Sequence, residues 1–371
     1  MDIKNKIAYL DYSPHFAGAE RALSTIIANL DRKQYEPILV FPYPKEHHHR
    51  YDTLGCKKKY LSNKVKWWMG SDYWKKPIRG SDFIKRTILG YKLAIFLKSH
   101  NIQILHINLL RPDCFMWLFF CKLMKIRIIG HFRSLPMSWV PPKIVQQSCD
   151  VIISVSKIVR EHAMSKYKHK HNIVIYDSVP SPLFHKQYTR LNIISSVAAL
   201  FPNKGHDNAI RAFATISEKY PEYELHIVGG GNKNELYRLK KLAQESGFEN
   251  KIKFTESQVS NVEEIYSQSK LILSLTKEGE AFGLVPFEAA TYDTPFIAPD
   301  KGAIKEILQN NVSGILVNTE DYIAIAQKID WVLSHYSRGA NICKQAHRIV
   351  DTQLTPQEMS RKIMEVYNSL S

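Results

Sequence analysis

The stretch from residue 271 to residue 290 passes from an apolar run through a short polar loop into a helical pattern. It reads Leu271-Ile272-Leu273-Ser274-Leu275, then Thr276-Lys277-Glu278-Gly279-Glu280, then Ala281-Phe282-Gly283-Leu284-Val285-Pro286-Phe287-Glu288-Ala289-Ala290. The apolar run predicts a strand covered on both faces, as in a parallel sheet. A glycine closes the loop, and a helix is expected from Leu284 because a proline is tolerated in a first turn. A buried strand joined to a helix in this way is the repeating unit of α/β folds.

Similar strands occur along the chain and alternate with helical patterns. In the first half the predicted strands are Ile7–Leu10, Pro37–Phe41, Ile102–Ile107, Ile126–Ile129 and Val151–Val155. In the second half they are Leu225–Val228, Ile252–Phe254, Leu271–Leu275, Pro295–Ala298 and Ile315–Val317. Amphipathic helices are predicted between strands, for example over Asn208–Lys219 and Glu235–Ser246. This alternation predicts an α/β fold of doubly wound, Rossmann-like sheets.

The length of 371 residues predicts two domains, because a single core rarely grows so large. The region Tyr176–Asn192, which contains Pro180 and Pro182, interrupts the alternation and is the expected hinge. We expect a domain of residues 1–182 and a second of residues 183–354, with a C-terminal helix 355–371 that joins the first. Ligands of such sheets bind at the carboxyl ends of the strands, so the chemistry is expected in strand-to-helix loops of two facing domains.

The loop before Leu284 has the composition of an anion site. Free N–H groups and the dipole at the helix start suit a diphosphate. Glu280 in the loop can hydrogen-bond sugar hydroxyls, and Glu288, one turn into the helix, can accept from a diol such as ribose. Both glutamates could instead simply decorate a helix start, where acidic residues are favourable. Their combination with Gly283 after an apolar strand favours the ligand site.

This stretch resembles the donor-binding motif of retaining glycosyltransferase family 4, whose GT-B fold has two Rossmann-like domains facing across a cleft. Glu280 and Glu288 are separated by seven residues, as in that motif. Five other stretches agree in order and spacing: Phe16-Ala17-Gly18-Ala19-Glu20-Arg21, Asp150-Val151-Ile152-Ile153-Ser154-Val155-Ser156, Pro202-Asn203-Lys204-Gly205-His206, His226-Ile227-Val228-Gly229-Gly230-Gly231 and Asn311-Val312-Ser313-Gly314-Ile315-Leu316-Val317. The resemblance covers nearly the whole chain and is clearest from residue 196 to residue 317.

The resemblance implies roles for the residues of the donor loop. Glu280 would contact the transferred sugar, and Glu288 would contact the donor ribose. The N–H groups around Phe282, Gly283 and Leu284 would hold the diphosphate or the sugar. The donor is therefore expected to be a nucleotide sugar, with UDP ahead of GDP as its nucleotide, and no cofactor is expected.

Three residues outside that loop also receive roles from the resemblance. Lys204 would neutralise the diphosphate as a mobile ammonium group. Gly18 would let the backbone approach the donor where a Cβ would collide. His131 would face the reacting sugar, although a partly buried, hydrogen-bonded histidine is the alternative, and His106 is read as structural. Glu280, His131 and Lys204 are thus the expected catalytic residues.

One position departs from the family pattern. The family commonly has an arginine five residues before the lysine, and here that position is Ala199. Either another cation substitutes, with Arg133 and Arg111 as candidates, or the leaving group is held less tightly. The departure leaves a second class of function open, namely a non-catalytic GT-B subunit that stabilises a partner transferase. Another sugar-nucleotide enzyme of this fold, such as an epimerase or an inverting transferase, is disfavoured by the spacing of the two glutamates.

The resemblance implies transfer of a hexose or related sugar with retention, to a glycan or lipid-linked acceptor in cell-surface polysaccharide biosynthesis. The sequence contains no Asp-x-Asp motif, so a metal-bridged diphosphate is not expected. Charge builds on the leaving nucleoside diphosphate, and Lys204 with the helix start would stabilise it electrostatically.

The positive charge of the chain is concentrated in one segment. The net charge is +16, and residues 57–98 alone hold a net of +10. This segment contains the residues expected to face a membrane: Trp67, Trp68, Trp74, Lys75 and Lys76. Aromatic side chains beside lysines suit an interface with anionic head groups, although a solvated, solubilising face is the alternative. Nucleic acid is not expected as a partner because no nucleic-acid motif accompanies the charge.

Other features bear on location and metals. No secretory signal is expected, because the first apolar run, Ile7–Leu10, is too short for one, and the most apolar stretch, Cys114–Met124, is shorter than a spanning helix. Five irregularly spaced cysteines without a Cys-x-x-Cys pair indicate reduced thiols. His47-His48-His49 has no second ligand cluster and is expected to be a solvated loop rather than a metal site. We expect a cytoplasmic protein at the inner face of the cell membrane.

Overall fold

The computed structural model describes residues 4–13, 16, 18–63, 80–111, 114–135, 143–165, 167–180, 189–255 and 262–370. The chain divides into two compact units. The first comprises Met1–Ser178 together with Pro356–Ser371, and the second comprises Val179–Thr355. The described residues contain no helix that is both long enough and apolar enough to cross a bilayer.

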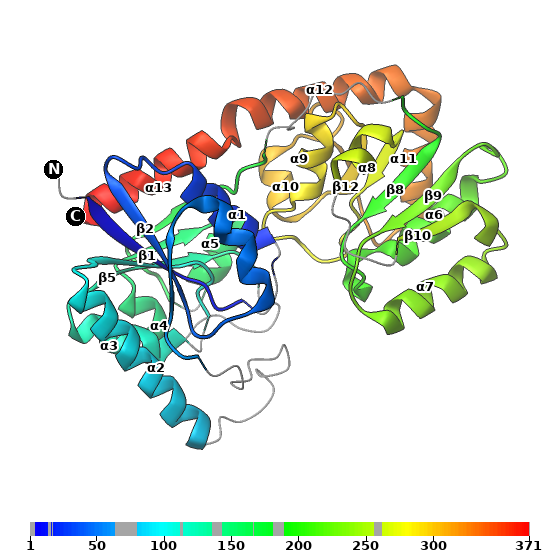
Figure 1. The fold of residues 1–371 in the computed structure, drawn as a ribbon. Helices are drawn as coiled ribbons and strands as arrows, with labels where there is room; N and C mark the ends of the chain where they lie inside the picture. The colour runs from blue at the N-terminus through cyan, green and yellow to red at the C-terminus, as the bar shows by residue number, and fades with distance from the viewer. Residues whose placement is uncertain are drawn as a thin grey trace. The chain divides into compact units, whose positions relative to one another are not determined.

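The first unit is built on a seven-stranded parallel sheet with helices along both faces (Figure 1). Its strands are β1 (Asn5–Leu10), β2 (Tyr35–Phe41), β3 (Lys57–Tyr60), β4 (Ile104–Ile107), β5 (Arg127–Phe132), β6 (Val151–Ser154) and β7 (Asn172–Val174), in the spatial order β3-β2-β1-β4-β5-β6-β7. Its helices are α1 (Gly18–Ala28), η1 (Glu46–Leu54), α2 (Gly80–Ser99), α3 (Phe115–Leu123), α4 (Lys143–Ser148), α5 (Lys157–Met164) and α13 (Pro356–Leu370).

The second unit is built on a six-stranded parallel sheet in the order β10-β9-β8-β11-β12-β13. The strands are β8 (Ile193–Val197), β9 (Glu224–Val228), β10 (Ile252–Thr255), β11 (Leu271–Leu273), β12 (Phe296–Pro299) and β13 (Ile315–Val317). The helices are η4 (Pro202–Lys204), α6 (His206–Ile216), α7 (Lys233–Glu245), η5 (Glu249–Lys251), α8 (Val262–Gln268), α9 (Leu284–Thr291), α10 (Gly302–Ile307), α11 (Tyr322–Ser334) and α12 (Tyr336–Gln353).

The predicted fold class is confirmed, because both sheets are parallel and doubly wound. All ten predicted strands overlap a strand of the structure. Three strands were not predicted, β3, β7 and β8. β3 and β7 lie at the two edges of the first sheet. β8 is a central strand whose Ser195 and Ser196 are nevertheless buried, so they interrupt the apolar run that a buried strand usually shows.

The C-terminal helix α13 completes the core of the first unit. Met359, Ile363 and Tyr367 on this helix pack into the same apolar cluster as Tyr9 and Leu23. Figure 1 shows α13 in red beside α1, with which it makes contact. Burial of such side chains contributes roughly 1.5–3 kcal/mol each, so the last residues of the chain are a structural part of its first half.

The His47–His49 segment differs from the solvated loop that was expected. It lies in η1, and the ring of His48 is buried and stacks on Phe41 with 3.8 Å between ring centroids. Burial lowers the pKa of His48 to about 3. All five cysteines are free thiols, and four of them are buried.

Candidate functional site

Three loops meet at one edge of the second sheet. β8 lies between β9 and β11. The chain leaves β8 toward β9 and leaves β11 toward β12, in opposite directions along the sheet, and ligands of doubly wound sheets bind at such a switch point. The amide of Lys277, after β11, donates to the carbonyl of Asn203, after β8, at 2.8 Å. The amide of Leu200 donates to the carbonyl of Gly230, after β9, at 3.0 Å. These backbone bonds join the three predicted loops into one surface.

Lys204 and Glu280 form an ion pair on this surface. Lys204 Nζ lies 2.7 Å from Glu280 Oε1, and Thr276 Oγ1 donates to the same oxygen at 2.5 Å. The side chains of Lys204 and Glu280 are 28% and 17% exposed, so a ligand can reach both charges. The structure thus brings together two residues that were predicted from separate loops. Thr276 was not singled out, because a threonine after a strand has no distinctive pattern.

Gly205 lets the lysine loop turn back against β11. Its φ is +75°, and a Cβ there would lie 2.0 Å from the carbonyl oxygen of Leu275. No other residue fits so close to a neighbouring backbone. Gly205 therefore sets the position of the preceding Lys204 next to the donor loop.

Gly283 leaves space for the carboxylate of Glu280 beside the start of α9. Its φ is +83°, and a Cβ there would lie 2.6 Å from Glu280 Oε2. α9 begins at the next residue, Leu284, so its unpaired amide groups lie beside this carboxylate. The ring of Phe282 is buried and stacks on Phe287 at 5.5 Å, which leaves its backbone as the part able to meet a ligand.

Glu288 is positioned by a tyrosine that sequence reasoning missed. Tyr266 on α8 donates its hydroxyl to Glu288 Oε2 at 2.6 Å. The Tyr266 ring is only 3% exposed, whereas Glu288 is half-buried. The tyrosine orients one carboxylate oxygen of Glu288. No spacing in the sequence links Tyr266 to the donor motif.

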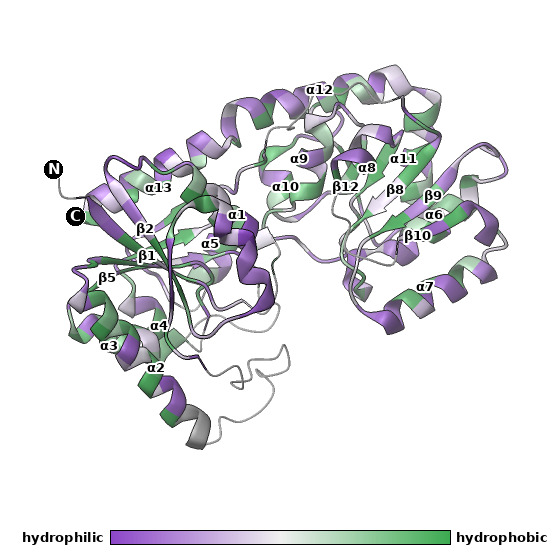
Figure 2. Cartoon of the chain, viewed as in Figure 1, coloured by the Kyte–Doolittle hydropathy of each residue, from purple (hydrophilic) through white to green (hydrophobic). Residues whose placement is uncertain are grey.

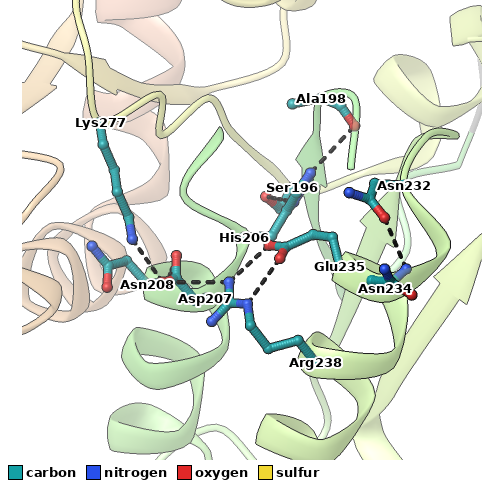
Figure 3. A network of polar contacts seen from close by, with 10 residues as sticks. All are labelled: Ser196, Ala198, His206, Asp207, Asn208, Asn232, Asn234, Glu235, Arg238 and Lys277. Atoms are coloured by element: carbon teal, nitrogen blue, oxygen red, sulfur yellow. Dashed lines mark hydrogen bonds and ion pairs between the residues drawn. The ribbon is translucent and has the colours of Figure 1, made fainter. Parts of the chain in front are cut away.

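Behind the lysine loop lies a network of charges that the sequence did not predict (Figure 3). Asp207, in the first turn of α6, accepts from Lys277 Nζ at 2.6 Å and lies 3.7 Å from an Arg238 nitrogen. Arg238 on α7 makes a two-pronged contact with Glu235, at 2.8 and 2.7 Å. The two cations and the two carboxylates therefore neutralise one another. Their contacts connect the donor loop with α6 and α7.

His206 joins this network to the centre of the sheet. Figure 3 shows its ring between Ser196 and Ala198, with bonds of 2.9 Å to Ser196 Oγ and 3.2 Å to the Ala198 carbonyl. Burial lowers the pKa of His206, so the ring is a neutral donor and acceptor. Because His206 follows Gly205 directly, it anchors the lysine loop to β8.

The cations proposed to replace the missing arginine are already engaged within the first unit. Arg133 is 1% exposed and is ion-paired with Asp177, and its Nε donates to Asn108 at 3.0 Å. Arg111 lies over the ring of Tyr12, 5.8 Å from its centroid. Ala199 itself is exposed, between the end of β8 and the lysine loop. The buried Arg133 is thus a structural cation in this conformation.

His131 lies at the end of β5 in a buried polar network. His131 Nδ1 is 3.1 Å from Arg133 Nη2 and 3.2 Å from His106 Nε2. His106 Nδ1 is 2.7 Å from the hydroxyl of Tyr367 on α13, which lies 2.9 Å from the hydroxyl of Tyr9. The network connects a predicted site residue to the C-terminal helix through His106.

Arg133 decides where the proton of His131 resides. A guanidinium group can only donate, so His131 Nδ1 must accept. His106 Nε2 lies 3.2 Å from the same nitrogen, while the hydroxyl of Tyr367 donates its proton to Tyr9. The proton of neutral His131 is left on Nε2, a buried atom without a hydrogen-bond partner among the described residues. Burial, followed by the charge of Arg133, holds the pKa of His131 well below its usual range, so His131 is a neutral N–H donor.

Gly18 begins α1, where the carbonyl of the next residue, Ala19, accepts from Asn108 Nδ2 at 3.2 Å. Among the described residues, no heavy atom lies within 4 Å of the place where a Cβ on Gly18 would be. The protein itself therefore does not require a glycine here.

The five residues expected to face a membrane, 67, 68 and 74–76, lie outside the described residues. The described residues contain no cluster of three or more metal-ligating His, Cys, Asp or Glu side chains.

The comparison with protein families matches residues 184–349 to the family described as "Glycosyl transferases group 1". These residues contain the lysine loop, Glu280 and Glu288. This match of 166 of the 371 residues confirms the predicted resemblance for the part of the chain that carries the donor loops.

Solved structures with this fold match nearly the whole chain. A glycosyltransferase from Rickettsia africae is 19% identical, with a TM-score of 0.81 over 99% of this chain and 98% of that one. Anabaena HepE, solved in complex with UDP and glucose, is 17% identical, with a TM-score of 0.80 over 98% of this chain and 100% of that one. These likenesses show the fold, which is GT-B.

A curated relative from Haemophilus influenzae is described as an uncharacterized glycosyltransferase. It is 27% identical over 192 residues, which are 51% of this chain and 53% of the relative. The chain thus spans about half the length of the curated relatives that it matches, or less.

Proposed function

We propose that this protein transfers a hexose or a related sugar from a nucleoside-diphosphate donor, with retention and without a metal ion. The observation that carries the proposal is the convergence of Lys204, Glu280 and the start of α9 at the switch point of the second sheet. One ammonium group and one set of helix amides there suit a diphosphate, and the glutamates suit hydroxyl groups.

The proposed roles follow from what each group can do chemically. Lys204 would shift from Glu280 to the diphosphate and stabilise the charge that develops as the leaving group departs. Glu280, still held by Thr276, would then accept from sugar hydroxyls, and Glu288 would accept from the ribose. His131 would donate a hydrogen bond from Nε2–H to a sugar oxygen. Gly18 would leave room for the donor substrate.

UDP is the proposed nucleotide, and a glycan or a lipid-linked glycan at the inner face of the cell membrane is the proposed acceptor. The fold neighbour HepE was solved with UDP, which supports UDP here without establishing it for this chain. Cell-surface polysaccharide biosynthesis is the proposed pathway class.

Calorimetric titration with UDP and GDP, without metal, tests the donor site. We expect micromolar binding of UDP, weakened roughly tenfold or more in Lys204→Ala and in Glu288→Ala, because each change removes a charged hydrogen-bonding group. Lys241→Ala is the matched control, since the Lys241 side chain on α7 is 66% exposed and its ammonium group lies 3.8 Å from the carboxylate of the exposed Glu245. Failure of both nucleotides to bind would refute the proposal and favour the non-catalytic subunit that Ala199 leaves open.

A further inference from the structure

The first unit exposes a cluster of large apolar side chains on three consecutive helices. The cluster, here called the α2–α3–α4 face, comprises Ile84, Ile88, Tyr91 and Ile95 on α2, Phe119 and Leu123 on α3, and Ile144 on α4. Thirteen large apolar side chains are exposed among the described residues, and seven of them lie on these helices. Figure 2 shows green residues along α2 and α3. Such clustering marks a contact surface rather than scattered surface residues.

The exposed residues of α2 form a stripe separate from the face that packs on the protein. Their spacing of four, three and four residues places Ile84, Ile88, Tyr91 and Ile95 along one side of the helix. Leu89, Leu93 and Leu97 are buried on the other side. α2 therefore has one apolar face for the core and a second that the described residues leave uncovered.

Contacts between rings connect α2 with α3. The ring of Tyr91 meets Phe120 of α3 edge-on at 5.7 Å, and Phe120 contacts Phe119 at 5.3 Å. At Gly90 the helices approach so closely that a Cβ would lie 2.4 Å from the Met116 carbonyl oxygen. α3 in turn packs against α4 and against β5, the strand that carries His131. The face is therefore one rigid surface on the unit that holds His131.

The charge around this face is predominantly positive. From residue 84 to residue 148 the sequence contains ten lysines and arginines and one acidic residue, Asp113. Just outside that range, Asp82 lies within α2, and Asp150 pairs with Lys122 of α3 at 2.9 Å. Lys92 and Lys98 are exposed on α2, between and beyond the apolar residues. Long lysine side chains can keep their ammonium groups at phosphate level while apolar neighbours enter a bilayer.

We propose that the α2–α3–α4 face docks on the surface of an anionic lipid bilayer, with α2 lying in the plane of the interface. Apolar side chains with exposed lysines among them, in a segment of net positive charge, complement anionic head groups. A second copy fits less well, because a two-fold contact would set the same positive rim against itself. At about 1.5 Å per residue, the stripe from Ile84 to Ile95 offers a contact roughly 17 Å long. The inference deepens the proposed function, since a lipid-linked acceptor lies at such an interface.

Vesicle flotation with the full chain tests the proposal. The probes are vesicles of phosphatidylcholine alone and of phosphatidylcholine mixed with phosphatidylglycerol, at low and high ionic strength. We expect binding to the anionic vesicles that weakens at high ionic strength, because exposed charges are screened. The triple variant Ile84→Ser, Ile88→Ser, Ile95→Ser is expected to bind roughly tenfold or more weakly, because three apolar side chains no longer enter the interface.

A second triple variant controls for the general loss of exposed apolar surface. Tyr237→Ser, Val312→Ser, Ile323→Ser alters three exposed apolar residues of the second unit and is expected to bind vesicles like the wild type. Equal vesicle binding by wild type and the α2 triple variant would overturn the proposal, as would an absence of wild-type binding. A dimer in sedimentation that the α2 variant abolishes would overturn it in favour of a second copy. UDP titration of the α2 variant separates the two ideas, because intact UDP binding with lost vesicle binding leaves the donor site standing.

Discussion

Arg133 Nη2 lies 3.1 Å from Nδ1 of His131 and sets that nitrogen as an acceptor. His106 Nε2 lies 3.2 Å from the same nitrogen, and His106 Nδ1 lies 2.7 Å from the hydroxyl of Tyr367 on the C-terminal helix. The ring of His131 is therefore a neutral donor at Nε2 rather than a base or a cation. A pattern of residues around a histidine cannot reveal this, because the direction of each hydrogen bond depends on partners distant in the sequence.

The proton positions can be observed directly. Nitrogen NMR is expected to show His131 protonated at Nε2 at neutral pH. Tyr367→Phe should leave this tautomer unchanged, because Arg133 remains in place. A proton on Nδ1 of His131 in the wild type would contradict the assignment.

Side chains that mimic one ring nitrogen test the role of His131 as a donor. Glutamine places an amide N–H near the position of the imidazole Nε2, whereas leucine offers no donor. We expect donor-sugar hydrolysis to be roughly tenfold faster in His131→Gln than in His131→Leu, the factor that one hydrogen bond of about 1.4 kcal/mol supplies. Equal rates in the two variants would show that Nε2–H does not contact the substrate.

The buried histidines of the first unit predict acid instability. Burial lowers the pKa of His48 and of His106 to about 3, and that of His131 well below its usual range. The unfolded chain takes up protons at these residues below pH ~6.5 while the folded chain does not, so their stabilising contribution is complete above that pH and falls below it. Each contributes a loss of roughly 1.4 kcal/mol per pH unit between about pH 6 and pH 4.

Urea unfolding between pH 7 and pH 4 measures this slope. His48→Phe is expected to reduce the slope by about one proton, because phenylalanine can stack on Phe41 without titrating. Conversion of the exposed His100 to glutamine is the control and should leave the slope unchanged. A slope that does not respond to His48→Phe would show that this ring titrates alike in both states.

Gly283 is expected to be essential for the position of Glu280. Gly283→Ala combines a positive φ with a Cβ 2.6 Å from Glu280 Oε2, and should destabilise the chain by about 1–3 kcal/mol while weakening UDP binding. Gly247→Ala is the matched control, because Gly247 has φ +75° and nothing lies within 4 Å of the added Cβ. Similar loss of UDP affinity in both variants would remove the specific role of the Glu280 contact.

Tyr266 is expected to tune nucleotide affinity through Glu288. Tyr266→Phe deletes the hydroxyl 2.6 Å from Glu288 Oε2 and should weaken UDP binding about three- to tenfold, the effect of one typical hydrogen bond of about 0.7–1.4 kcal/mol. Tyr237→Phe, at a tyrosine that is 74% exposed, serves as the control. Calorimetry distinguishes this outcome from unchanged affinity, which would mean that Glu288 needs no orienting partner.

Local patterns were sufficient to predict most of the fold. Apolar runs such as Ile7–Leu10 and Ile315–Val317 identify buried parallel strands, because both faces of such strands are covered. The missed strands depart from that rule for physical reasons. β3 carries three lysines at a sheet edge, where charged residues are tolerated. In β8, Ser195 and Ser196 are buried because Ser269 and His206 satisfy their hydroxyl groups.

The sequence by itself determined the α/β class and the loops where Lys204, Glu280, Gly283 and Glu288 would lie, since residue type and spacing along one βα unit carry that information. Only the tertiary structure decided that Lys204 pairs with Glu280, that Tyr266 holds Glu288, and that Arg133 sets the protons of His131. It also decided which side of α2 remains uncovered. Hydrogen bonds and burial join residues from distant parts of the chain, and their partners exist only once the strands have assembled into sheets.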